Sequence, residues 1–280
     1  MGEKKLVAIM STRGNFSEIA TSIASFVQCG IHVIVVDQGA EKDKFRLQEK
    51  FGKSLSYFWT PGQRGISTSR NVALRNLPAD AEYFVLAAET SICEPDWIAP
   101  VIKKFESDST IGAICGRYQF GDSLTINPGS GELKGRGFLV PVEESFVFST
   151  KILESGLLFN EAIGTGSKGL AWCGEGPELL YRVGQSGFTI PAVDELIGIG
   201  SRIFYAHRWI VEFKYGIGFS IVAKVIAGKK WTFTRAFASL AHPSEIKRVG
   251  AKHWIVNNLA IVLGRNLGFF IPSHHYDVKP

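Results

Sequence analysis

The sequence lacks three features that would each have placed it in a different class of protein. It has no run of about 18 apolar residues, the length that a membrane-spanning helix needs. The nearest run, Trp254–Leu263, contains two asparagines and is followed by Arg265, and the first apolar segment, Leu6–Met10, is too short for a signal peptide. Its cysteines have no paired spacing, which predicts neither a zinc site nor a disulfide framework: Cys29, Cys93, Cys115 and Cys173. We therefore expect a protein of the reducing cytoplasm.

Acidic residues are also scarce, but only near the end of the chain. Residues 201–280 contain twelve lysines and arginines against three aspartates and glutamates, a net charge of +9. The whole chain carries +5, so residues 1–200 carry −4. A length of 280 residues with 45% apolar side chains suits one large domain, or a core with an appendage. The charge difference predicts a domain at residues 1–200 and a basic helical extension at residues 201–280.

The basic extension is expected to contact anionic groups other than nucleic acid. Its positive charges alternate with long apolar stretches, and it contains no recognisable nucleic-acid-binding module. Apolar helices that carry lysine and arginine can lie in a membrane interface, which predicts a peripheral membrane contact through residues 209–270. The alternative is a helical subdomain packed on the sheet or on a second subunit. Its helices are predicted at Trp209–Ala227, Trp231–Leu240 and Lys252–Leu267.

Short apolar runs alternate with helical patterns in the first 120 residues. The runs predict buried strands at Leu6–Met10, His32–Val36, Leu55–Trp59, Tyr83–Ala87 and Ile111–Cys115, and helices are predicted at Phe16–Val27, Lys42–Phe51 and residues 67–77. Strands separated by helices form βαβ units, so we expect an α/β fold with a mainly parallel sheet. Such sheets bind ligands beyond the carboxyl ends of their strands. The candidate site residues after these strands include Thr12, Arg13, Asp37, Ala88 and Glu89.

Asp37 and the segment Arg64–Asn71 are candidates for nucleotide binding. A carboxylate at the end of a strand can accept a hydrogen bond from a base or a ribose hydroxyl, although Asp37 can equally be a turn-forming residue. Small residues that open a helix let backbone amides approach an anion closely. Arg70 would then stack on a base or pair with Asp37; the alternative is a surface helix with a solvated arginine.

Glu175 and Glu178 are candidates for a general base. They lie in the segment Trp172–Glu178, between a glycine-rich stretch and a predicted helix at Glu178–Gly187. A carboxylate there can remove a proton from a substrate hydroxyl, and it can equally cap the helix. The glycine-rich stretch Gly164–Gly169 matches GxGxxG but follows no buried strand, so we do not interpret it as a dinucleotide-binding fingerprint.

Several ordered motifs together resemble a family 2 glycosyltransferase with the GT-A fold, of the type that builds bacterial polysaccharides. The resemblance covers residues 5–228. It rests on Val35–Gly39, Arg64–Asn71, Leu86–Thr90 with Glu94–Trp97, Phe159–Glu161, Gly174–Leu180 and Lys214–Gly218. Each motif is weak alone, but their order and spacing are specific.

The resemblance implies transfer of a sugar from a nucleotide-sugar donor to a hydroxyl of a glycan or lipid-linked glycan, with inversion. Asp37 would contact the base, Arg70 would lie by the nucleotide with Thr12, Arg13 and Arg64 on the donor side, and Ala88 and Glu89 would overlie the metal and diphosphate. Trp172 and Lys168 would lie on the acceptor side. The expected location is the cytoplasm, or the inner face of the plasma membrane.

Three positions depart from the family pattern. Ala87–Glu89 stands where the family has Asp-x-Asp, Gly176 stands where it has the Asp base, and Gly200 or a neighbour replaces a histidine. Glu89 alone would hold Mg²⁺ or Mn²⁺ mainly through water and the donor's phosphates. Alternatively, Arg13, Arg64 or Lys168 neutralises the leaving group. Glu175 becomes the nearest candidate base, with Glu178 second. A rival reading is a catalytically impaired relative that binds a nucleotide-sugar or glycan as a partner subunit.

Overall fold

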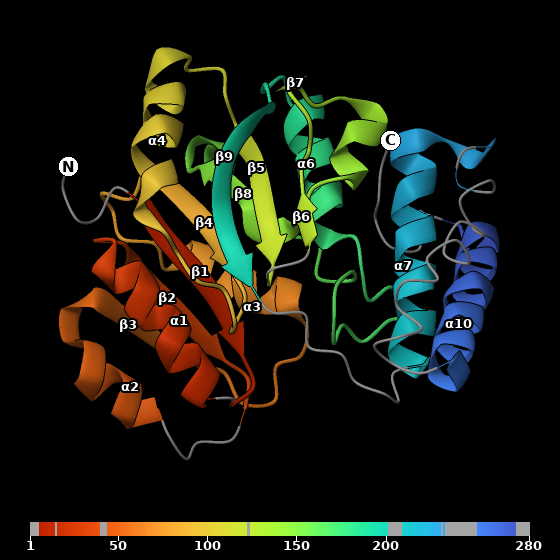
Figure 1. Ribbon diagram of the computed structural model, residues 1–280, viewed down its shortest axis with the longest axis horizontal. Coiled ribbons are helices and arrows are strands. Elements are labelled where there is room, and N and C mark those ends of the chain that lie inside the picture. Colours follow the sequence, from red (N-terminus) through yellow and green to blue (C-terminus); the bar gives the residue numbers. More distant parts are fainter. Residues whose placement is uncertain are drawn as a thin grey trace. The chain divides into compact units, whose positions relative to one another are not determined.

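The chain divides into two compact units in a computed structural model (Figure 1). The structure describes residues 6–14, 16–39, 44–121, 124–200, 209–230, 232 and 251–272. Unit 1 comprises residues 1–64, 68–159 and 179–202, and unit 2 comprises residues 65–67, 160–178 and 203–280. The two units are described separately.

Unit 1 is built on one sheet of nine strands. Their order is β3-β2-β1-β4-β8-β5-β9-β7, with β6 paired to β5. The bounds are β1 Leu6–Thr12, β2 His32–Asp37, β3 Leu55–Trp59, β4 Tyr83–Ala87, β5 Ala113–Phe120, β6 Leu124–Ile126, β7 Gly131–Glu132, β8 Phe146–Ser149 and β9 Pro191–Gly200. Six strands run one way, while β6, β7 and β8 run against their neighbours. The predicted α/β fold with a mainly parallel sheet is confirmed.

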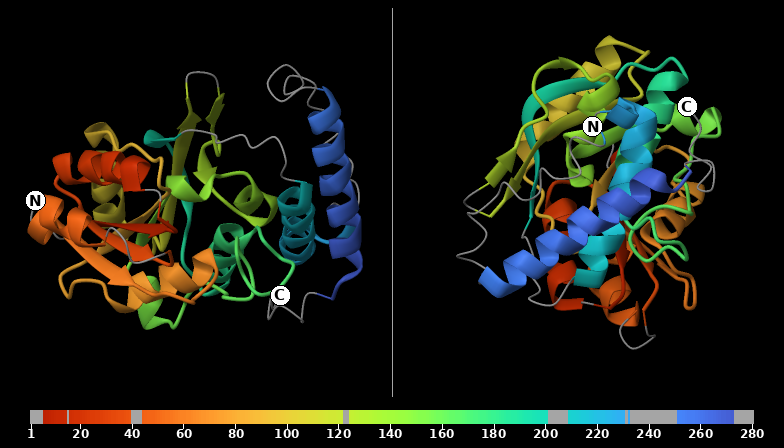
Figure 2. Two further views of the ribbon diagram at one scale, coloured as in Figure 1. Left: turned by 90° about the horizontal axis from the view of Figure 1, so that it is seen from below. Right: turned by 90° about the vertical axis from the view of Figure 1, so that its right-hand side faces the viewer.

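Helices cover both faces of this sheet. Helices α1 and α4 lie on one face, and α3 and α6 lie on the other (Figures 1 and 2). The helix bounds are α1 Phe16–Gln28, α2 Lys44–Phe51, α3 Ile66–Arg75, α4 Ile98–Ser107, α5 Lys151–Glu154 and α6 Glu175–Gln185. Short 3-10 helices lie at Gly52–Ser54, Pro95–Trp97, Gly135–Leu139 and Glu143–Ser145.

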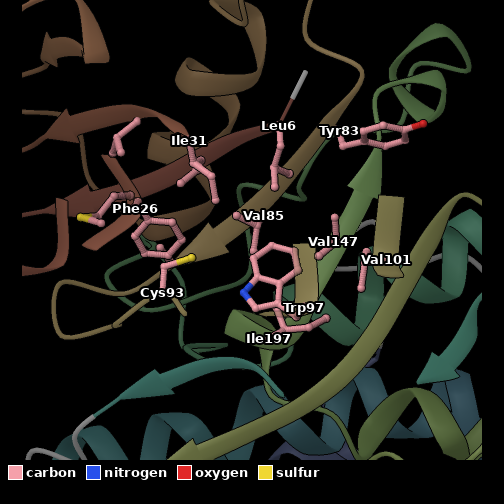
Figure 3. Close-up of a cluster of buried hydrophobic side chains, with 14 of the residues drawn as sticks. Leu6, Phe26, Ile31, Tyr83, Val85, Cys93, Trp97, Val101, Val147 and Ile197 are labelled. Atoms are coloured by element: carbon pink, nitrogen blue, oxygen red, sulfur yellow. The ribbon is translucent and has the colours of Figure 1, made fainter. Parts of the chain in front are cut away.

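The spacing of apolar residues explains the packing of α1 and α4. Buried Ile19, Ile23 and Phe26 recur at helical spacing and give α1 one apolar face. These residues belong to one cluster with side chains from β1, β4, β8 and β9, in which Figure 3 shows Phe26 together with Trp97 and Val101. Alternate residues of the strands point into this cluster, and the intervening residues face the other layer, so the strands are buried on both faces. The core therefore holds the strand ends in a fixed arrangement.

The segment between Gln119 and Gly137, which is rich in glycine, serine, asparagine and proline, is partly ordered into strands. It contains the end of β5, then β6 and β7, followed by the start of a 3-10 helix at Gly135. Tyr118 pairs with Ile126 across β5 and β6, and Gly131 pairs with Ala192 on β9. Its glycine, serine and proline content hid these short pairings, since strands of two or three residues have no readable period.

Unit 2 contains two long helices, α7 Trp209–Ala227 and α10 Ala251–Phe270. They cross closely (Figure 2), because glycines lie at the contact: a Cβ on Gly216 would lie 2.5 Å from the carbonyl oxygen of Ile261, and one on Gly268 would lie 2.5 Å from that of Ile217. Both helices match the predictions, whereas most of the helix expected at Trp231–Leu240 falls outside the described residues. Of the helices in the described ranges, none is long and apolar enough to span a membrane.

Candidate functional site

The carboxyl ends of β1 and β4 place Thr12 and Glu89 in contact. The hydroxyl of Thr12 donates to Oε1 of Glu89 at 2.5 Å, and the backbone N–H of Arg13 donates to the same oxygen at 3.2 Å. Ala88 is fixed by the hydroxyl of Ser91, which accepts from its N–H at 2.9 Å. Four of the residues predicted for the donor side therefore lie together in unit 1.

Asp37 ends β2 next to this group and has no exposed surface. It stands in register with Thr12 of the neighbouring strand. Its Oδ1 accepts from the N–H of Gly39 at 2.6 Å, and its Oδ2 accepts from the hydroxyl of Tyr57 on β3. A Cβ on Gly39 would lie 2.6 Å from the carbonyl oxygen of Arg13, so only glycine lets the loops after β1 and β2 approach this closely. Asp37 thus has both a turn role and a fixed carboxylate.

Arg70 is held by an acidic and an aromatic side chain. Its Nη1 donates to Oε2 of Glu143 at 2.7 Å, and its guanidinium lies 5.1 Å from the ring centre of Phe159. The adjacent Asn71 exchanges two hydrogen bonds with the backbone of Phe159, each 2.9 Å long. Arg70 is 4% exposed, so it is not the solvated surface arginine that the sequence also allowed. Arg64, by contrast, is exposed.

A second carboxyl group lies beside this ion pair. Burial and the neighbouring Glu143 raise the pKa of Glu144, while Arg70 acts in the opposite direction. Burial and the nearby Glu144 also raise the pKa of the Tyr118 hydroxyl. A Cβ on Gly200, one of the positions compared with the family's histidine, would overlap the hydroxyl of Tyr118. Tyr118 therefore occupies the space that a side chain at Gly200 would need.

In unit 2, the glycine-rich loop folds against the first residues of α3. The hydroxyl of Ser67 donates to the carbonyl of Ile163 at 2.6 Å, and the N–H of Ile66 donates to that of Thr165 at 3.0 Å. Gly164 has a φ of 109° and leaves no room for a side chain, since a Cβ would lie 2.8 Å from Oγ of Ser67. The glycines of this loop thus allow a turn and a close approach to the start of α3. This explains the GxGxxG match without a dinucleotide.

Glu175 and Glu178 open α6 and are both buried, at 4% and 1% exposed. The carboxyl carbon of Glu175 would lie 3.2 Å from a Cβ on Gly164, so this carboxyl group borders the glycine-rich loop. Glu178 donates its N–H to the carbonyl of Gly174 in the first turn. A Cβ on Gly174 would come within 2.9 Å of Val222, which explains the glycine before Glu175.

Trp172 and Lys168, predicted for the acceptor side, lie on the same loop. The indole N–H of Trp172 donates to the carbonyls of Ser167 and Gly169, each at 3.1 Å, and Nζ of Lys214 lies 3.8 Å from a ring centre of the indole. Lys168 is exposed. This contact joins the Lys214–Gly218 motif to the glycine-rich loop.

The acidic residues present fit a metal ion only in part. Within the described ranges, no three histidine, cysteine, aspartate or glutamate side chains gather to hold a metal. One oxygen of Glu89 already accepts two hydrogen bonds. Mg²⁺ takes about six oxygen ligands and is commonly completed by water and phosphate. Glu89 therefore fits an ion that arrives with a diphosphate and takes most of its ligands from phosphate and water.

Sequence reasoning missed Tyr57, Glu143 and Glu144. Tyr57 lies in the strand Leu55–Trp59, and nothing in the sequence of this strand marks it as a partner of Asp37. Glu143 lies 73 positions from Arg70, and no local spacing relates the two. Asn71 belongs to the Arg64–Asn71 motif, but its hydrogen bonds to Phe159 can be seen only in the folded chain.

Comparison with known proteins gives one family and several solved structures. The model of the family described as Glycosyl transferase family 2 matches residues 7–160, more than half of the chain. No curated protein sequence matches the chain.

The solved structures share its fold. The mannosyltransferase PcManGT from Pyrobaculum calidifontis, in complex with GDP-Man and Mn²⁺, aligns with a TM-score of 0.58 at 13% identity, over 94% of this chain and 73% of its own. S. aureus TarS 1–349 in complex with UDP-GlcNAc aligns with a TM-score of 0.60 at 12% identity, over 98% of this chain and 88% of its own. These similarities confirm the GT-A fold predicted from the sequence.

Proposed function

The chain belongs to glycosyl transferase family 2 and is a glycosyltransferase, and we propose that it transfers a sugar from a nucleotide-sugar to a hydroxyl acceptor with inversion at the anomeric carbon. Residues 1–200 would form the donor-binding and catalytic part, and residues 201–280 an extension. The observation that carries the proposal is the fixed carboxylate of Asp37 beside Thr12 and Glu89 at the carboxyl ends of parallel strands.

Donor binding is assigned to residues at these strand ends. Asp37 has no exposed surface and is oriented by Tyr57 and Gly39. A nucleotide that displaced the atoms covering it would find lone pairs able to accept from a base N–H or a ribose hydroxyl. Thr12, Arg13 and Ala88 line the same strand ends, and exposed Arg64 supplies positive charge for phosphate. Arg70 stays on the donor side, where its ion pair with Glu143 and its contact with Phe159 fix the surrounding segments. Nucleotide-sugars in two of the similar structures, GDP-Man and UDP-GlcNAc, support this class of donor.

Glu175 is assigned as the general base. In a single displacement, the base takes the proton of the acceptor hydroxyl while its oxygen attacks the anomeric carbon, and the bond to the nucleoside diphosphate breaks on the opposite face, which inverts the configuration. Glu175 supports this role because its carboxyl group borders the glycine-rich loop that carries Lys168 and Trp172. Glu178, 1% exposed, is the second candidate.

A divalent metal would be held by Glu89 together with water and the donor's phosphates. When bound, Mg²⁺ or Mn²⁺ neutralises negative charge on the diphosphate leaving group. The cations Arg13, Arg64 and Lys168 add to that neutralisation. Mn²⁺ in the PcManGT structure supports a metal in this class of fold.

The acceptor is proposed to be a glycan, or a lipid-linked glycan, in the assembly of a cell-surface polysaccharide. Trp172, which is half-buried, and Lys168, which is exposed, lie on one loop and would offer an aromatic ring and a positive charge to such an acceptor. The +9 charge of residues 201–280 supports a peripheral position at the cytoplasmic face of the plasma membrane.

A second candidate function follows from the missing acidic residues. Ala87 and Gly176 stand where the family pattern has acidic residues, which favours a relative that binds a nucleotide-sugar or glycan as a partner subunit without catalysis. A transferase and a partner that binds the nucleotide-sugar would both bind the donor, but only the transferase would cleave it.

One experiment tests donor binding and catalysis in the same sample. The purified chain is titrated with uridine and guanosine diphosphates by calorimetry, with Mn²⁺ and with EDTA, and release of nucleoside diphosphate from the matching nucleotide-sugar is then followed. Saturable binding with release supports the transferase. Binding without release, at any metal concentration and with glycan acceptors present, supports the binding partner. No binding refutes the transferase and a partner that binds the nucleotide-sugar.

A further inference from the structure

One face of α10 consists of large apolar side chains that are exposed. Leu259, Leu263 and Phe270 are 52%, 62% and 75% exposed. The full set on this helix is Ile255, Val256, Leu259, Leu263, Leu267 and Phe270, and at about 100° per residue these positions fall within an arc of about 120°. We call this set the α10 face. A contiguous exposed apolar surface of this kind marks an interaction site.

The opposite side of α10 is fixed against α7, which sets the direction of the α10 face. Gly264 and Gly268 contact the backbone of Phe213 and Ile217, so the two helix axes approach closely. Nζ of Lys224 donates to the carbonyl of Phe269 at 2.9 Å and to that of Ile271, which closes the end of the helix. The α10 face is therefore presented away from α7 by a helix pair that is already packed.

We propose that the α10 face docks on the surface of a membrane that contains anionic lipids. Its apolar side chains would enter the boundary between headgroups and acyl chains, as an amphipathic helix does. Trp209 and Ile210, 52% and 50% exposed at the start of α7, are suited to the same boundary, where tryptophan is enriched.

Charge selects a membrane over a second copy of the chain. Residues 201–280 carry +9, and exposed Lys229 and Lys230 follow α7 directly. A symmetric dimer through the α10 face would bring two such regions together, and like charges repel. Anionic headgroups offer the opposite charge to the same region, so apolar insertion and electrostatic attraction act together.

Docking through the α10 face would bring the chain to the membrane that carries the proposed lipid-linked acceptor. Only this consequence rests on the proposed function. Its evidence is the exposure, spacing and charge of unit 2. Binding to vesicles without donor or acceptor therefore tests it independently of sugar transfer.

The test is sedimentation of the full chain with vesicles of phosphatidylcholine, with and without phosphatidylglycerol. We expect the chain to bind the anionic vesicles at least tenfold more tightly than the neutral ones. Binding to the anionic vesicles should also weaken as salt is added. The variant L259Q/L263Q should bind the anionic vesicles at least tenfold more weakly. Unfolding midpoints within about 2 °C of the parent would show that these exposed positions leave the fold intact.

A matched control uses exposed apolar residues outside the α10 face. Val140 and Leu170 are 51% and 42% exposed, and V140Q/L170Q should bind vesicles like the parent chain. Equal binding by L259Q/L263Q and the parent would overturn the proposal. So would a dimer, detected by light scattering without lipid, that L259Q/L263Q dissociates while the parent shows no vesicle binding.

Discussion

The hydroxyl of Tyr57 donates a hydrogen bond to the carboxylate of Asp37, which has no exposed surface. The two residues lie on neighbouring parallel strands, and the N–H of Gly39 occupies the other carboxylate oxygen. A buried carboxylate needs such donors, because burial without them is costly. The same bonds fix the orientation of this carboxylate at the end of β2.

Removing the Tyr57 hydroxyl should weaken donor binding. Y57F leaves one oxygen of Asp37 without this donor, and a hydrogen bond to a charged group contributes about 1.5–3 kcal/mol. We expect the Kd for the preferred nucleoside diphosphate to rise about tenfold or more in calorimetry. The control Y181F removes a hydroxyl from α6, and its Kd should match the parent; an unchanged Kd in Y57F would refute the positioning role.

A methyl group at Gly39 should separate the loops after β1 and β2. Its Cβ would lie 2.6 Å from the carbonyl oxygen of Arg13, and relief of such overlap costs about 1–3 kcal/mol. We expect G39A to unfold at a lower temperature and to bind nucleoside diphosphate at least tenfold more weakly. The control G137A places its methyl 3.4 Å from Leu133, an ordinary contact, and should change neither measurement. Similar behaviour of the two variants would contradict the close approach.

The stability of unit 1 should depend on pH through Glu144. Burial and Glu143 raise its pKa in the folded protein. A carboxyl group whose pKa is raised on folding stabilises the fold below its unfolded pKa of about 4.3 and loses that contribution as pH rises through the folded pKa.

E144Q cannot ionise, so it should raise the unfolding midpoint at pH 7–8 relative to the parent, with little change near pH 4. Thermal unfolding across this range gives the difference directly. Exposed Glu106 provides the control, and E106Q should leave the pH dependence unaltered. A lower midpoint of E144Q at pH 7–8 would show that the charged carboxylate stabilises the fold.

Glu89 should make nucleoside diphosphate binding depend on a divalent metal, which calorimetry can measure. If the ion is held by this carboxylate, water and phosphate, Mn²⁺ should tighten nucleoside diphosphate binding in the parent chain. E89Q should lose most of that gain while it keeps the affinity measured in EDTA. A gain from Mn²⁺ that survives in E89Q would place the ion on other ligands.

The sequence was sufficient for the strands β1 to β4 and for the residues at their carboxyl ends. Leu55–Trp59 and Tyr83–Ala87 were predicted to the residue, because apolar runs bounded by polar turns define buried strands. The grouping of Thr12, Asp37 and Glu89 followed from the rule that parallel strands end at one edge.

The sequence was not sufficient for contacts that depend on the folded chain. The ion pair between Arg70 and Glu143 joins α3 to a 3-10 helix that lies 73 positions further along the chain. The overlap of Tyr118 with the space beside Gly200 depends on two strands with shifted register. Such relationships have no period or local spacing from which to predict them.

The assignment of Glu175 as the general base is tested most directly by turnover of two isosteric variants. E175Q and E178Q each replace a buried carboxylate at the start of α6, and donor binding by calorimetry should stay within about threefold of the parent in both. We predict that E175Q lowers kcat for sugar transfer by 10²–10⁴-fold, the usual contribution of a general base, while E178Q keeps most of it. Full turnover in E175Q, with turnover lost in E178Q, would contradict the account.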